Sequence, residues 1–135
     1  MRRVHILFFT LVVAGVLAVM QQYALEYYLY WVYWWFDIVM HAIGGLVIGL
    51  LVYAAGYRTL LKLVMTVILI GLVWEVFEYA IGVMTYEDDV LFDTILDLIM
   101  DTIGALGAYG IMRWWEQKSQ LPFIAERVAS PDQTS

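Results

Sequence analysis

Residues 93–104 read DTILDLIMDTIG, a run of Ile, Leu and Met in which aspartates recur four residues apart. Because an α-helix has about 3.6 residues per turn, this spacing keeps Asp93, Asp97 and Asp101 on one slowly drifting face. The opposite side of the run stays apolar, and small residues continue the acidic face from Gly104 onward. An apolar helix with acids along one face is typical of a membrane span whose acids turn toward a protein interior.

The composition indicates an integral membrane protein. Of the 135 residues, 64% are hydrophobic and 15% are charged, against roughly 45–50% and 25% in soluble proteins. The length leaves room for one domain. The chain contains no cysteine, which excludes disulfides, thiolate metal ligands and cysteine nucleophiles.

Apolar segments long enough to cross a bilayer recur along the chain, which predicts an all-α fold, a four-transmembrane-helix bundle. The N-terminal run resembles a signal peptide, but its apolar part is longer than usual, so we interpret it as the first span. Residues 1–116 then form a single transmembrane domain, and residues 117–135 form a polar cytoplasmic tail. The expected spans are residues 4–20, 37–56, 63–84 and 93–115.

Tyr and Trp crowd the segment from Gln21 to Phe36, between the first two expected spans. These side chains favour the lipid headgroup region, where the ring is buried and the polar tip is wet. The segment is therefore an interfacial connector or the aromatic start of the second span. A functional interpretation makes it part of a wall that receives a lipid headgroup or a sugar. The substrate rim predicted in this way consists of Trp31, Trp34, Trp35 and Tyr79.

The basic residues define an orientation. With four spans, all seven of them fall on the side of the two termini and of the connection between spans two and three. The positive-inside rule then places both termini in the cytoplasm. The expected location is the inner membrane of a bacterium or archaeon. The seven basic residues are Arg2, Arg3, Arg58, Lys62, Arg113, Lys118 and Arg127.

Ionisable residues of the last three spans fall at matching depths in the outer half of the membrane. At 1.5 Å of rise per residue, His41 and Asp97 lie about 6 Å below the outer boundary and Glu78 lies about 9 Å below it. No Lys or Arg is expected at that depth, so the acids must share protons or bind cations. The predicted site comprises Asp37, His41, Glu75, Glu78, Asp93, Asp97 and Asp101.

A divalent cation is the favoured occupant, because carboxylates with one imidazole suit Mg, Mn or Ca, and also Zn. Two other interpretations stay open. The acids are protonated and hydrogen-bond across helices, or they handle protons.

The order Asp-x-x-x-His with two following glycines, then Trp-Glu-x-x-Glu, then Asp-Thr-x-x-Asp and a closing Gly-Ala, resembles the YjdF-like bacterial inner-membrane proteins. More distantly it is similar to the VanZ-like membrane proteins linked to glycopeptide antibiotic resistance. The resemblance covers about Asp37 to Gly110. The VanZ-like pattern has Gln where Glu78 stands, Asn where Asp101 stands, and an arginine ahead of the aspartates that is missing here. The resemblance implies a bacterial or archaeal inner-membrane protein and supplies no established reaction.

Several functions are compatible with this pattern. A metal at the outer leaflet could activate water or polarise a phosphoryl oxygen in a hydrolase or transferase. The substrates would be lipid headgroups or polyprenyl-phosphate lipids that enter sideways from the bilayer. A cation or proton transporter is the alternative, although the cytoplasmic halves of the spans contain no ionisable residue except Tyr53 and Tyr109. A third function is a non-catalytic membrane subunit, and glycine-rich faces allow a homodimer. The basic residues are too few and scattered for nucleic-acid binding.

Overall fold

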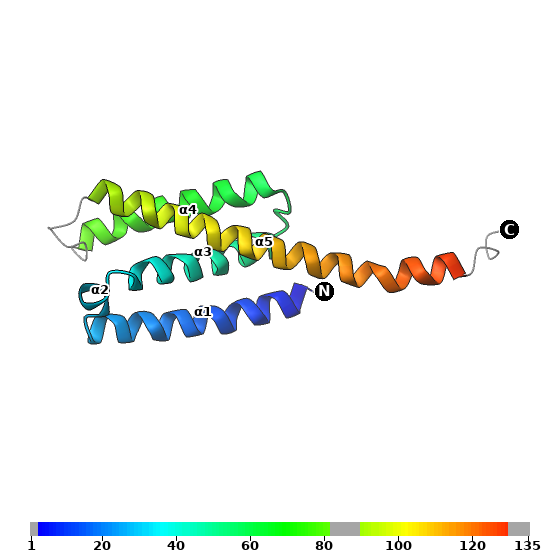
Figure 1. Cartoon of the computed structure of the whole chain (residues 1–135), viewed down its shortest axis with the longest axis horizontal. Helices are drawn as coiled ribbons and strands as arrows, with labels where there is room; N and C mark the ends of the chain where they lie inside the picture. The colour runs from blue at the N-terminus through cyan, green and yellow to red at the C-terminus, as the bar shows by residue number, and fades with distance from the viewer. Residues whose placement is uncertain (1–2, 82–89, 130–135) are drawn as a thin grey trace.

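The computed structural model describes residues 3–81 and 90–129, with side chains described over 4–81 and 90–118, and every regular element in this part of the chain is helical. The predicted all-α fold is therefore confirmed. The chain direction alternates along the four long helices (Figure 1). The acidic sequence Tyr86–Asp89, between the third and fourth expected spans, lies outside the described residues, as does the end of the expected third span. The helices are α1 (Arg3–Glu26), α2 (Leu29–Val32), α3 (Phe36–Ala54), α4 (Leu60–Ile81) and α5 (Val90–Ala129).

Three of these helices are long and apolar enough to cross a membrane, namely Val4–Glu26, Phe36–Ala54 and Leu60–Ile81. Large apolar side chains are exposed along α1 and α4, including Phe8, Leu11, Leu69 and Val76. A helix surface of this kind is suited to lipid rather than water.

The aromatic segment is divided among three elements. Helix α1 continues past the expected end of the first span to Glu26, and the Tyr23 and Tyr27 rings stack 5.8 Å apart at its end. Tyr28 then adopts a left-handed conformation with φ 55°, which turns the chain into the short helix α2. The connector is thus partly helical and reverses the chain within a few residues.

Helix α3 ends in a Schellman motif. Gly56 has φ 107°, a conformation that glycine adopts without the steric penalty of a Cβ. The Gly56 amide donates to the Tyr53 carbonyl at 3.0 Å, and the Tyr57 amide donates to the Val52 carbonyl at 3.2 Å. These bonds satisfy carbonyls that the helix end would leave unpaired.

Small residues bring α3 and α5 into backbone contact. A Cβ on Gly45 would collide with the backbone of Asp101, and one on Gly104 would collide with the backbone of Ala42 and Leu46. A Cβ on Gly49 would lie 2.9 Å from the Ala108 Cβ. Close backbone approach through small residues is the usual way in which membrane helices associate. It draws the acidic face of α5 against α3.

The bundle has an apolar half and an acidic half. The apolar core at the α3–α4 turn includes Leu50, Tyr53, Leu63 and Val67. At the same end, Glu116 forms ion pairs with Arg58 at 3.3 Å and with Arg113 at 3.5 Å. The basic α3–α4 turn and the basic part of α5 therefore lie together. Beyond this point α5 extends past the other helices (Figure 1).

Candidate metal centre

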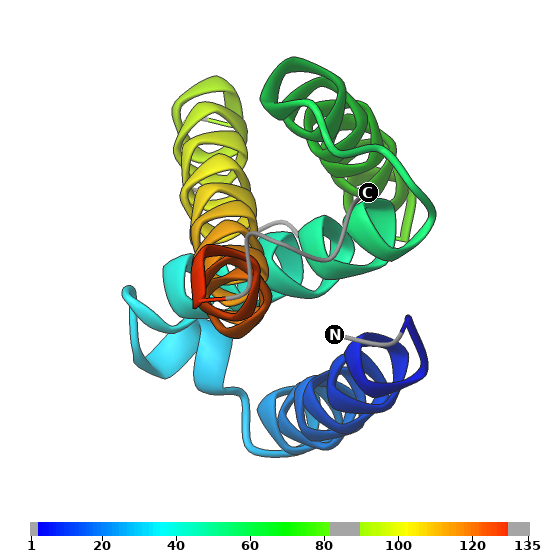
Figure 2. The same ribbon diagram turned by 90° about the vertical axis from the view of Figure 1, so that its right-hand side faces the viewer.

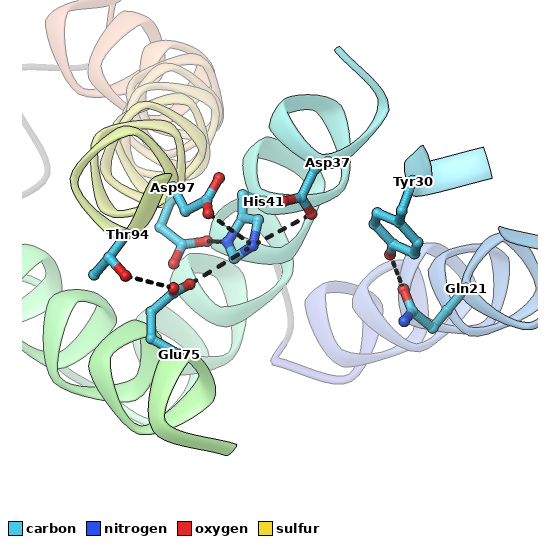
Figure 3. Close-up of polar contacts among 8 residues, drawn as sticks. Gln21, Tyr30, Asp37, His41, Glu75, Thr94 and Asp97 are labelled. Atoms are coloured by element: carbon cyan, nitrogen blue, oxygen red, sulfur yellow. Dashed lines mark hydrogen bonds and ion pairs between the residues drawn. The ribbon is translucent and has the colours of Figure 1, made fainter. Parts of the chain in front are cut away.

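His41 is the centre of the acidic half. It projects from α3 and is only 6% exposed. Its Nε2 atom lies 3.6 Å from Asp37 Oδ1, 3.8 Å from Glu75 Oε1 and 3.8 Å from Asp97 Oδ2. Figure 3 shows these carboxylates pointing toward the ring from α3, α4 and α5. Three helices that are distant in sequence thus present oxygens to one nitrogen.

The other ring nitrogen of His41 faces a different carboxylate. Nδ1 lies 3.5 Å from Asp101 Oδ1. A histidine that ligates a metal commonly donates its second ring N–H to a carboxylate, which fixes the tautomer and the ring orientation. With the proton on Nδ1, the lone pair of Nε2 is directed to the side of the other three acids.

Glycines make room for the Asp101 carboxylate. A Cβ on Gly71 of α4 would lie 2.5 Å from Asp101 Oδ2 and 2.9 Å from Leu98 Cδ2. A Cβ on Gly44 of α3 would lie 3.9 Å from Asp101 Oδ1. The absence of a side chain at Gly71 therefore matters for the site, since a larger residue at position 71 would displace the acid.

Two carboxylate oxygens at the centre have no hydrogen-bond partner. Glu75 is 5% exposed and receives a hydrogen bond from Thr94 Oγ1 on Oε2 at 3.0 Å, but its Oε1 atom is unsatisfied. Asp97 is 2% exposed and its Oδ2 atom is also unsatisfied. These are the two oxygens that lie 3.8 Å from His41 Nε2. A buried acceptor without a partner is costly, so each of these oxygens needs a partner, which a proton or a cation would supply.

The separations around Nε2 fit ligands of a shared ion. Distances of 3.6–3.8 Å are too long for hydrogen bonds, which measure about 2.7–3.2 Å. Two ligands bound about 2.0–2.5 Å from one ion lie about 3–4 Å apart. Within the described residues, Asp37, His41 and Asp97 form one such group with all ligand atoms within 4.8 Å, and His41, Glu75 and Glu78 form another.

The structure thus brings together six of the seven predicted site residues. In the part of the chain with described side chains, the ion pairs of Asp37, Glu75, Asp97 and Asp101 are all with His41. Asp93 lies one turn before Asp97, is half-buried, and belongs to neither ligand group. Five carboxylates around one imidazole leave a surplus of negative charge even when His41 is protonated.

The four predicted rim residues lie outside the pocket that His41 lines. Trp31, Trp34, Trp35 and Tyr79 are exposed, and none of them lines the cavity beside His41. The aromatic side chains that do line it are Tyr30 and Trp74. The left-handed residue Tyr28 interrupts the helical periodicity of this aromatic segment. The sequence pattern therefore does not indicate which of its rings points toward the cavity.

Tyr30, Gln21 and Thr94 are polar residues near the site that the sequence argument did not select. The Tyr30 hydroxyl donates a hydrogen bond to Gln21 Oε1 and joins α2 to α1 (Figure 3). Burial raises the pKa of the Tyr30 hydroxyl, and the Asp37 and Glu78 carboxylates raise it further. The phenol therefore remains a donor. Thr94 precedes Asp97 by three residues, a spacing that could have placed it on the acidic face.

Comparison with protein-family models, with curated proteins and with solved structures gives no match for this chain. The resemblance to YjdF-like and VanZ-like proteins stays a prediction.

Proposed function

We propose that this protein is a four-span inner-membrane protein whose His41 cluster binds one divalent cation. The protein ligands are His41 Nε2, Asp37, Asp97 and Glu75, with Glu78 within reach, and Asp101 orients the ring. The observation that carries this proposal is the arrangement of unpaired, buried Glu75 and Asp97 oxygens 3.8 Å from His41 Nε2.

The first half of α5 is the fourth span in this proposal. Its support is the close packing of α5 against α3 and α4, which are both apolar enough to cross a membrane. Arg58, Arg113 and Glu116 cluster at the end of the bundle opposite to the His41 cluster, which supports a cytoplasmic location for that end. The cation would then lie toward the outer leaflet.

A bound cation gives the site a chemical capacity. Hard oxygen ligands favour Mg, Mn or Ca, and the imidazole also suits Zn. Such an ion polarises a phosphoryl oxygen or activates water. A metal-dependent hydrolase or transferase is therefore the activity that the donor set supports best. One ion per chain is expected, because both ligand groups share His41 and Nδ1 faces Asp101.

Elemental analysis of the purified protein tests the proposal. We expect about one divalent ion per chain in the native protein and none in the His41→Gln variant or in the Asp97→Asn, Glu78→Gln double variant. His5→Gln is the matched control, since His5 is the only other histidine and lies exposed on α1. A native protein that stays free of metal after incubation with Mg, Mn, Ca and Zn would show that protonated acids explain the cluster instead.

A further inference from the structure

A cavity of about 310 Å³ lies beside the His41 cluster, between α1, α3 and α4. Its volume falls at the lower end of the range for small-molecule sites, about 300–1,000 Å³. Most of its wall is aliphatic, with side chains contributed by all three helices: Ala14, Leu17, Ala18, Val47, Ile48 and Ile70.

The cavity lies between two helices that do not pack on each other. Helix α1 packs on α3, and α4 packs on α3 and α5, but α1 and α4 make no direct contact over the described residues. Figure 2 shows α1 and α4 lying apart, with α3 as the helix that both contact. Both α1 and α4 line the cavity, which therefore lies where these two helices do not pack on each other.

One end of the cavity is polar and belongs to the metal centre. Asp37, His41, Glu78 and Asp101 line it, whereas Glu75 and Asp97 do not. Tyr30 and Gln21 stand at the same end and supply neutral hydrogen-bonding groups. Carboxylates alone would repel an anion, but a divalent ion with a free coordination position would give a phosphate oxygen a direct ligand at this end of the cavity.

We infer that this cavity binds a phosphate-bearing membrane lipid, with one hydrocarbon chain along the aliphatic wall and the phosphate on the cation held by the His41 cluster. This inference rests on the proposed cation site. Phosphate oxygens are hard ligands of the kind that Mg, Mn and Ca prefer. The lipid enters between α1 and α4.

The aliphatic wall favours a lipid over free phosphate. On α1 the wall extends from Ala14 to Ala18, about 6 Å along the helix, and the polar Gln21 follows one turn later. A free phosphate would occupy only the polar end. A hydrocarbon chain would cover the wall, and each buried CH₂ contributes about 0.8 kcal/mol.

Native mass spectrometry of the full chain released from nanodiscs tests the inference. The nanodiscs contain a phosphate-free galactolipid with a small fraction of either phosphatidic acid or diacylglycerol of identical chains, with Mn²⁺ or with EDTA. We expect one phosphatidic acid to be retained with Mn²⁺, at least tenfold less with EDTA, and no retained diacylglycerol. Inorganic phosphate at millimolar concentration should not displace the lipid.

Two variants separate the cavity from the cation. Ala18→Phe fills the aliphatic wall and should reduce lipid retention at least tenfold while the metal content stays native. Val19→Phe is the control on the same helix, because Val19 is 56% exposed and does not line the cavity. An unchanged metal content also shows that the Ala18→Phe protein is folded.

Each failure is distinguishable. A metal-loaded protein that retains no phosphatidic acid, or an Ala18→Phe variant that retains it fully, overturns the lipid site and leaves the cation site intact. Equal retention of diacylglycerol overturns the role of the phosphate. Displacement by inorganic phosphate assigns the polar end to a soluble anion and also overturns the inference. A protein without metal overturns the proposed function itself.

Discussion

At the scale of single residues, the two nitrogens of His41 divide the acids into ligands and a supporting partner. Asp97 faces Nε2 at 3.8 Å and Asp101 faces Nδ1 at 3.5 Å. Asp97→Asn should therefore abolish stoichiometric metal binding. Asp101→Asn should weaken the affinity only about 10–100-fold, as expected for loss of an outer partner. Titration of both purified variants with Mn²⁺ measures the difference, and equal losses would contradict this division.

Thr94 has a positioning role for Glu75. Its hydroxyl donates to Glu75 Oε2 at 3.0 Å, which leaves Oε1 toward His41. Thr94→Val removes the donor with little change in shape, so we expect several-fold weaker metal binding and recovery of affinity in Thr94→Ser. Thr102→Val is the matched control, because the Thr102 hydroxyl donates to the Leu98 carbonyl of its own helix at 2.8 Å. If Thr102→Val weakens metal binding as much as Thr94→Val, the effect is one of helix stability.

At the scale of helices, the backbone contact between α3 and α5 holds the site together. Gly45→Ala or Gly104→Ala places a methyl group against the facing backbone, so the helices must separate. We expect a loss of about 1–3 kcal/mol in unfolding free energy and reduced metal content. Gly110→Ala should leave both properties unchanged or slightly improved, since a Cβ there meets nothing within 4 Å. Thermal unfolding in detergent checks the three variants together.

Helix periodicity predicted the residues that gather around His41, with Asp93 in excess, but not the internal geometry of the site. The spacings Asp37–His41, Glu75–Glu78 and Asp97–Asp101 place these residues on common faces, and the structure joins them. Which nitrogen of His41 meets which acid depends on the rotation and register of α3 against α5. The close approach at Gly45 and Gly104 sets that register.

Helix ends were predicted less well, for physical reasons that differ along the chain. The end of α3 follows from Gly56, a residue whose left-handed conformation is common after helices. The end of α1 at Glu26 and the turn at Tyr28 have no such signal, because tyrosine rarely adopts positive φ. Aromatic residues at a membrane boundary indicate how deep a segment lies in the bilayer and not which way each ring points. The predicted rim residues therefore differ from the aromatic residues that line the cavity.

At the scale of the whole molecule, a cation that links three helices should contribute to stability. The ligands come from α3, α4 and α5, so the ion binds the folded bundle and not the unfolded chain. At a concentration one hundred times the dissociation constant, the gain is about 2.7 kcal/mol. Because ligands bind metal in their deprotonated forms, this gain should shrink as the pH is lowered. Melting temperatures with Mn²⁺ or EDTA at pH 8 and pH 5 test this, and His41→Gln should show no response to the metal.

The orientation of the bundle decides which leaflet supplies a ligand to the site. One residue at each end of the bundle can report this orientation. Thr59 lies in the α3–α4 turn beside Arg58, and Trp34 lies in the aromatic connector at the other end and is 82% exposed. The chain contains no cysteine, so a single Thr59→Cys or Trp34→Cys substitution creates a unique thiol. In intact cells, a membrane-impermeant maleimide should label Trp34→Cys and leave Thr59→Cys unlabelled until the cells are opened. The reverse pattern would place the His41 cluster in the cytoplasmic half of the membrane, where its ligand would come from the inner leaflet.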